Sequence, residues 1–112
     1  MRAALLIAAG LAAAPLSAAD APAEGQRIFA RVCSACHAND LSEAPQLKQP
    51  AMWTARIAKG RDTLLAHALN GFVGPSGEEM PPRGGRPELT DAEVSAALDY
   101  IIATVNPSRT TP

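Results

Sequence analysis

Two cysteines and one histidine form the part of this sequence with the clearest chemistry. They stand in the segment Cys33-Ser34-Ala35-Cys36-His37, which uses both cysteines of the chain. Two thiols at this spacing can form thioether bonds with the two vinyl groups on one edge of a porphyrin. The next residue then lies under the macrocycle, where its imidazole can bind the iron. The spacing therefore predicts one covalent haem c, attached at Cys33 and Cys36, with His37 as an axial ligand of the iron.

Two other kinds of site could use the same residues. A redox-active Cys-x-x-Cys disulfide normally occurs in a βαβ context, and no alternating strand pattern is evident in this sequence. A structural zinc ion needs four ligands, and the one other histidine available to complete such a set is His67. The sequence favours haem over both alternatives.

The second axial ligand of the iron has three candidates: Met80, Met52 and His67. Met80 lies in the segment EEMPPRGG, where two prolines stiffen the backbone and two glycines allow a tight turn beside a porphyrin. Its soft thioether would favour reduced iron and raise the reduction potential, as an electron carrier requires. Met52 opens a predicted helix, where methionine usually fills gaps in the core. His67 lies on a predicted helix, where a histidine is more often an exposed or half-buried surface residue. Met80 is therefore the predicted ligand, with Met52 and His67 as open alternatives.

Four helical segments are expected to position these residues, because apolar residues recur at helical spacing in each. They cover residues 22–34, 50–59, 62–70 and 90–105. The last begins with a capping box formed by Thr90 and Glu93. Residues 71–88 hold four prolines and five glycines without any period, and a loop of this length in a small domain is usually functional. The predicted fold class is all-α, with about four helices wrapped around one covalently bound haem.

The first 19 residues have the pattern of a secretory signal peptide. Arg2 is followed by an apolar run over residues 3–14, a proline and the small residues Ser17-Ala18-Ala19. A membrane-spanning helix needs roughly 20 apolar residues, and this alanine-rich run is shorter. We therefore expect cleavage after Ala19, with retention of the leader as an anchor as the alternative. Residues 20–112 would then form one monohaem domain.

Composition limits the partners and the core of this domain. The formal net charge of −1 for the whole chain becomes −2 without Arg2, so nothing indicates nucleic acid or an anionic membrane surface as a partner. A domain of this size has a marginal core, and the sequence contains two Phe, one Trp and one Tyr. A large apolar cofactor would supply the missing interior.

Through the motif CSACH and the combination of MPPRGG with the following segment LTDAEV, the chain resembles the small bacterial class I c-type cytochromes, and most closely the cytochrome c-five group. The resemblance implies His–Met ligation and electron transfer without catalysis. It also implies that Gly25 and Phe29 pack against Tyr100, and that the carbonyl of Pro45 accepts a hydrogen bond from the ring of His37. The similar segments are GQRIF, CSACH, AP, WTARIAKGRDTLLAHALNG, MPPRGG and LTDAEVSAALDYI.

The same resemblance suggests that Trp53 and Arg56 lie near a haem propionate, although core packing and a solvated charge are the simpler roles for these two residues. One feature departs from the group. Some members carry a second cysteine pair after the methionine loop, whereas this chain has GGRPELTD there. The stiffness of the loop would then depend on Pro81, Pro82 and Pro87.

The predicted function is that of a periplasmic electron carrier, exported in a Gram-negative bacterium, whose haem iron cycles between Fe(II) and Fe(III). Its partners would be transient redox proteins, with a bc1-type complex or a dehydrogenase as donor and a terminal oxidase or reductase as acceptor. Stable membrane insertion after cleavage is not expected. If Met80 does not bind the iron, the alternative is an open-site haem protein, either peroxidase-like or a gas sensor.

Overall fold

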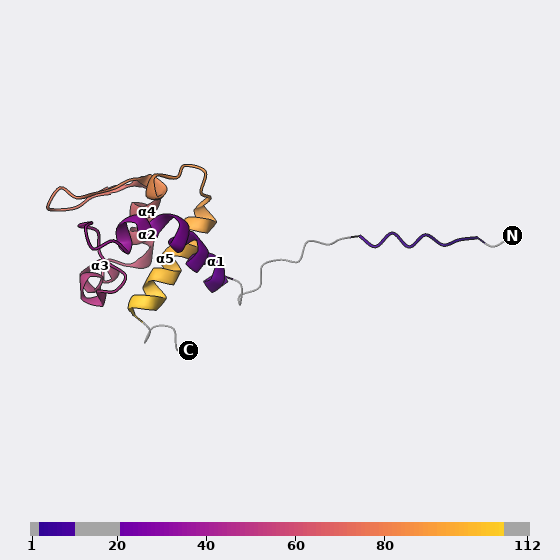
Figure 1. Ribbon diagram of the computed structural model, residues 1–112, viewed down its shortest axis with the longest axis horizontal. Helices are drawn as coiled ribbons and strands as arrows, with labels where there is room; N and C mark the ends of the chain where they lie inside the picture. Colours follow the sequence, from indigo (N-terminus) through magenta and orange to yellow (C-terminus); the bar gives the residue numbers. More distant parts are fainter. Residues whose placement is uncertain (1–2, 11–20, 107–112) are drawn as a thin grey trace.

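The computed structural model describes residues 3–10 and 21–106 (Figure 1). Residues 3–10 have no regular secondary structure, and the predicted cleavage site after Ala19 lies outside the described residues. Within the described ranges, no helix combines the length and the apolar composition needed to cross a membrane.

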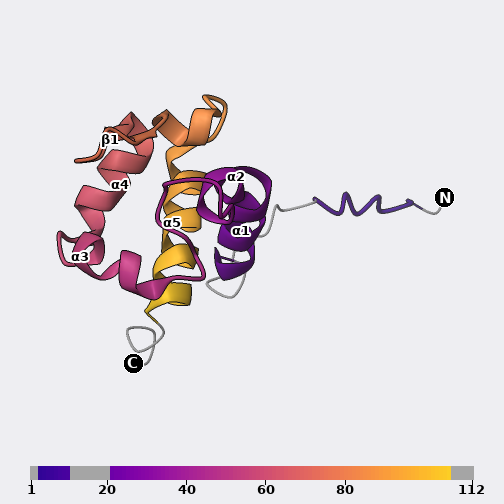
Figure 2. The ribbon, with the colours of Figure 1, turned by 60° about the vertical axis from the view of Figure 1, so that its left-hand side comes forward.

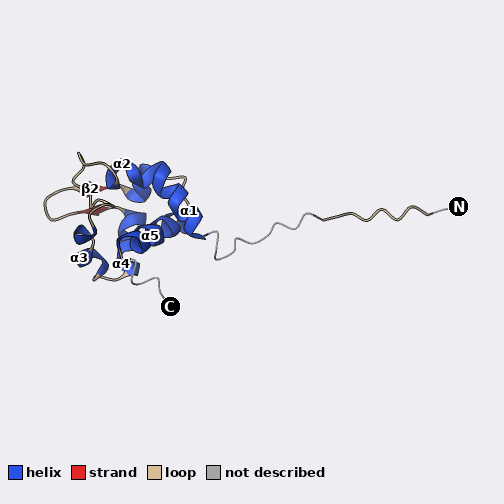
Figure 3. Ribbon diagram, turned by 60° about the horizontal axis from the view of Figure 1, so that its bottom comes forward, coloured by secondary structure: helices blue, strands red, loops and turns tan. Residues whose placement is uncertain are grey.

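Helices are the main secondary structure of the described chain, in agreement with the predicted all-α class (Figure 3). They are α1 (Ala21–Ile28), α2 (Ser34–His37), α3 (Thr54–Ile57), α4 (Arg61–Asn70) and α5 (Asp91–Val105). The predicted capping box opens α5: the Thr90 hydroxyl accepts from the Glu93 amide at 3.1 Å, and the Glu93 carboxylate accepts from the Thr90 amide at 3.0 Å. Because both orphan amides are satisfied, the start of α5 is well defined.

The first helical segment is longer than expected and changes its winding. A π-helical turn, Phe29–Cys33, joins α1 to α2, so that helical backbone continues to His37. The second expected helix is also divided, into a 3₁₀ turn at Pro50–Met52 and the short helix α3, with Trp53 between them. Apolar spacing does not reveal a π turn, because one inserted residue leaves the pattern on each side intact.

The segment expected to be an irregular loop contains a small β-hairpin, which corrects the expectation that the chain has no strand. Strand β1 (Phe72–Val73) pairs antiparallel with β2 (Glu79–Met80), and Phe72 lies opposite Met80. Strands of two residues are too short to show the alternation by which strands are recognised in a sequence. This pairing positions Met80, the predicted axial ligand.

Helix α1 crosses α5, so the two ends of the described domain meet (Figure 2). Gly25 allows this close approach: a Cβ atom placed on it would lie 2.1 Å from the carbonyl oxygen of Ala96. One turn further on, the ring centroids of Phe29 and Tyr100 lie 5.4 Å apart, with 55° between the ring planes. Aromatic pairs favour such a tilted arrangement. The contacts of Gly25 and Phe29 with the last helix therefore match what the resemblance implied.

Gly25→Ala is expected to destabilise the protein by about 1–3 kcal/mol, because overpacking a tight contact costs this much. Helix propensity alone predicts the opposite sign, since alanine is the better helix former by about 1 kcal/mol. Thermal unfolding of the haem-containing protein distinguishes the two effects. The exposed neighbour Gln26 offers the control Gln26→Ala, which should change stability by less than about 0.5 kcal/mol. An equal or higher midpoint for Gly25→Ala would show that the crossing can relax.

The buried apolar residues form two groups rather than one continuous core. The first comprises Ile28, Val32, Leu89, Val94 and Ala97. The second comprises Phe29, Trp53, Ile101 and Val105. Members of both groups line one cavity, so the helices enclose a space that their own side chains leave unfilled.

Candidate functional site

A cavity of about 610 Å³ lies among the helices and the hairpin. Its volume falls in the range of cofactor and ligand sites, roughly 300–1,000 Å³. Cys33, Cys36 and His37, all in the helical segment that follows α1, line this cavity together with Met80 of β2. The fold thus brings Met80 to the same space as the Cys-x-x-Cys-His motif, although more than 40 residues separate Met80 from His37.

His37 is held in one orientation by a bond from its ring to the backbone. It is 8% exposed, and its Nδ1 atom lies 2.8 Å from the carbonyl oxygen of Pro45. A carbonyl oxygen can only accept, so Nδ1 carries the proton and Nε2 is the nitrogen with a free electron pair. Burial lowers the pKa of His37, the bond to Pro45 opposes this, and the positive charge of Arg56 lowers the pKa further. The ring is therefore neutral at pH 7, which is the form that binds metals.

The two thiols do not have the features of a redox disulfide or of a zinc site. Cys36 is exposed and Cys33 is partly buried. Burial raises the pKa of the Cys33 thiol, which opposes the thiolate that a reactive disulfide exchanger needs. Among the residues that the structure describes, no three His, Cys, Asp or Glu side chains are grouped so that they could hold a metal ion. The thiols are left available for bonds to a cofactor.

Met80 is positioned by the hairpin and by Gly71, which has a φ of +85°. A Cβ atom on Gly71 would lie 3.1 Å from the Met80 carbonyl oxygen and 3.1 Å from the ring of Pro82. Both the conformation and the space therefore favour glycine. The rival ligands differ: Met52 packs against the second buried group, and His67 lines the cavity with its ring stacked on Phe72 at 4.1 Å.

Trp53 and Arg56 both line the cavity, and each donates a hydrogen bond to a backbone carbonyl. The indole N–H of Trp53 donates to the carbonyl of Gln46 at 3.0 Å, and this ring lies 5.5 Å from that of His37. Arg56 donates to the carbonyl of Met52 at 2.5 Å through one of its several N–H groups. The indole N–H of Trp53 therefore has a backbone partner, whereas Arg56 keeps further N–H donors. A position near a haem propionate stays a prediction for both residues.

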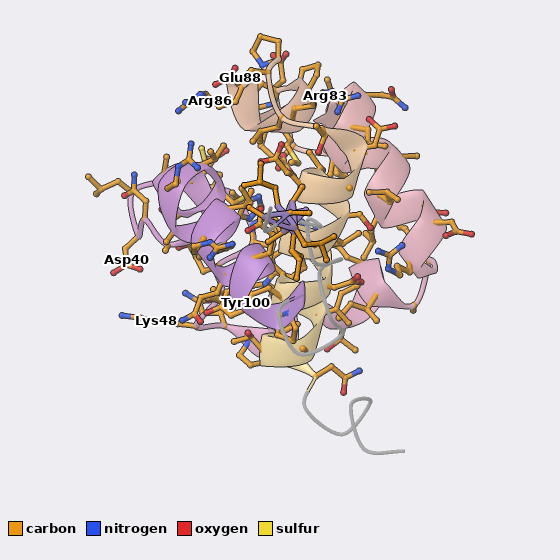
Figure 4. The ribbon with its side chains drawn as sticks, turned by 90° about the vertical axis from the view of Figure 1, so that its right-hand side faces the viewer. Asp40, Lys48, Arg83, Arg86, Glu88 and Tyr100 are labelled. Atoms are coloured by element: carbon orange, nitrogen blue, oxygen red, sulfur yellow. The ribbon has the colours of Figure 1, made fainter. Side chains whose placement is uncertain are left out.

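The charges after Met80 are engaged within the fold. Arg83 donates to the carbonyl of Leu89 at 2.9 Å and to Asp91 at 2.6 Å, which fastens the segment after Met80 to the start of α5. Arg86 pairs with Glu88 at 2.6 Å, and both lie at one end of the molecule (Figure 4).

Sequence reasoning did not assign a role in the site to Gly71 or Gln46, because neither belongs to a motif with known chemistry.

Comparison with known proteins identifies the family. Residues 20–101 match the family model described as cytochrome C oxidase, cbb3-type, subunit III. The chain is also 38% identical over 100 residues to cytochrome c-555 of Chlorobaculum tepidum, covering 89% of this chain and 91% of that protein. The chain belongs to the class I c-type cytochromes. This family carries covalently attached haem c, and the cysteines at positions 33 and 36 have the spacing for it.

Two further relatives agree with this assignment. Cytochrome c5 of Azotobacter vinelandii is 38% identical over 76 residues, which cover 66% of this cytochrome and 86% of the relative. A solved structure of the electron transfer complex of nitrite reductase with cytochrome c matches with a TM-score of 0.64 and 34% identity, over 74% of this chain and 95% of that one. The predicted family, the helical cytochrome c fold and the role in electron transfer are confirmed.

Proposed function

We propose that this cytochrome carries single electrons in the periplasm through one haem c that is attached to Cys33 and Cys36 and ligated by His37 and Met80. The observation that supports this most directly is that all four residues line one cavity. The remaining lining is largely apolar, with Ile28, Val32, Leu64, Leu98 and Ile101 among its residues, as a porphyrin face requires. The haem would supply reversible one-electron exchange between Fe(II) and Fe(III).

The residues of the chain then have separate tasks. The carbonyl of Pro45 accepts a hydrogen bond from the ring of His37, which fixes the ring and would make it a stronger electron donor to the iron. The strand pairing with Phe72 and the close packing of Gly71 hold Met80 at the cavity. Occupation of both axial positions would leave no open site for oxygen or peroxide chemistry. An open-site haem protein remains the alternative if Met80 does not bind.

Partners would dock transiently over a small surface, as redox proteins commonly do. The similar solved structure is a complex of a cytochrome c with nitrite reductase, so we include an acceptor of the reductase type beside a terminal oxidase. A bc1-type complex or a dehydrogenase would act as donor. Export is proposed through residues 1–19, with cleavage after Ala19 and no stable membrane insertion afterwards.

A haem assay on exported protein tests this function. Expressed in a bacterium with haem-ligation machinery, the chain should be recovered from the periplasm as a red protein without residues 1–19. A pyridine haemochrome assay should give one haem c per chain, and mass spectrometry should show the haem retained after denaturation, because thioether bonds are covalent. A compact but colourless protein in that fraction would refute the proposal.

A further inference from the structure

Gln46 is a buried polar residue that the electron-transfer role does not by itself explain. It is 5% exposed, although it lies in the loop between α2 and the 3₁₀ turn Pro50–Met52. Two charged side chains of the same loop, Asp40 and Lys48, are exposed and point outward (Figure 4). A buried amide is tolerated only when its polar atoms find partners.

Every polar atom of the Gln46 side chain has a partner in the backbone. Its Oε1 accepts from the amide of Asn39 at 2.9 Å. Its Nε2 donates to the carbonyls of Cys36 and Ala44, each at 2.9 Å. The carbonyl of Gln46 itself accepts from the indole of Trp53 at 3.0 Å. One side chain therefore joins the residues on either side of His37 to the far end of the loop.

The position of Gln46 makes these bonds relevant to His37. Gln46 directly follows Pro45, whose carbonyl is bonded to His37 Nδ1 at 2.8 Å. On the other side of Pro45, the carbonyl of Ala44 accepts a hydrogen bond from the side-chain amide of Gln46. The backbone amide of Leu47, the residue after Gln46, donates to the carbonyl of His37 at 2.8 Å. The peptide that carries the Pro45 carbonyl is thus held from both sides, and moving it away from the ring would break several hydrogen bonds that are at least partly buried.

We propose that Gln46 is a positioning residue that sets the reduction potential by holding the Pro45 carbonyl against His37. This inference rests on the proposed ligation of the iron by His37. A strong bond at Nδ1 makes the imidazole a better electron donor, and a better donor stabilises Fe(III) more than Fe(II). Loosening the Pro45 carbonyl would weaken the donor and raise the potential.

The test compares two substitutions in the same loop of the haem-containing protein. Gln46→Met keeps the length of the side chain and removes its hydrogen bonds. Gln49→Met is the control, because Gln49 is exposed and its side chain makes no hydrogen bond to the described part of the chain. We expect Gln46→Met to raise the potential and to speed proton exchange at His37 Nδ1 about tenfold, the factor for one ordinary hydrogen bond. The control should change neither.

Two further measurements keep the test decisive. If Gln46→Met does not accumulate with haem, Gln46→Asn retains an amide that is too short to span the same partners, and the same comparison applies. In the unaltered protein, the Gln46 side-chain amide protons should exchange slowly. Rapid exchange there, or a haem-containing variant with unchanged potential and unchanged Nδ1 exchange, overturns the inference. Neither result affects the proposed function, which fails instead if the unaltered protein lacks covalent haem.

Discussion

Replacing Cys33 and Cys36 together by serine is expected to abolish cooperative folding. Without thioether bonds the haem would not be retained covalently, and the cavity of about 610 Å³ would lose its content. The lining of this cavity is largely apolar, and without the cofactor it would lose its packing partner and become exposed to water. Small domains have a total stability of about 5–15 kcal/mol, so the packing that remains cannot compensate for the loss.

Circular dichroism during thermal and urea unfolding measures this effect. The double variant should show reduced helix content and a broad transition, whereas Ala35→Ser should melt like the unaltered protein. Ala35 lies between the two cysteines and is exposed, so this control places a serine in the same motif and keeps both thiols. A compact, haem-free double variant with a sharp transition would show that the haem is not needed for the core.

Met80→Ala is expected to change the haem more than any other substitution outside the Cys-x-x-Cys-His motif. Loss of the thioether should remove the absorption band at about 695 nm that His–Met ligation gives in the oxidised protein. The reduction potential should fall by about 100 mV or more, within the range of about 0.8 V over which axial ligands act. Added imidazole should then bind at the vacated position, and visible spectroscopy with redox titration reads out all three effects.

The rival ligands supply matched controls for this experiment. Met52→Ala and His67→Ala should both retain the band at about 695 nm, because Met52 packs in the core and the ring of His67 is stacked on Phe72. Loss of the band in either variant, with retention in Met80→Ala, would reassign the ligand. Absence of the band from the unaltered protein would favour the open-site alternative.

Features that depend on nearby residues were predictable from the sequence. The capping box of α5 lies within four residues. The apolar period of that helix predicts an inward face of Val94, Ala97, Leu98, Ile101, Ile102 and Val105. Five of these six residues are buried, and Ile102 is partly exposed. The Cys-x-x-Cys-His motif is equally local, because its chemistry follows from spacing alone. The packing of Gly25 against the last helix came from resemblance, since no periodicity pairs residues so distant in the chain.

Features that depend on distant partners were missed. The pairing of Phe72 with Met80 is formed by two residues on each side of a turn, which is too little to produce a strand pattern. The role of Gln46 depends on the carbonyls of Cys36 and Ala44 facing the same point, and a sequence does not show where backbone groups converge. The same holds for the bond from the indole N–H of Trp53 to the carbonyl of Gln46.

The crossing of α1 and α5 has a consequence for the order of folding. Gly25 and Ala96 are about 70 residues apart in the chain, and closing a flexible loop of that length costs about 4 kcal/mol of entropy. A haem fixed at Cys36 early in maturation would let Met80 close a shorter loop first. The entropy cost of docking α5 on α1 would then be smaller. The prosthetic group would then act as a template during maturation, before it ever transfers an electron.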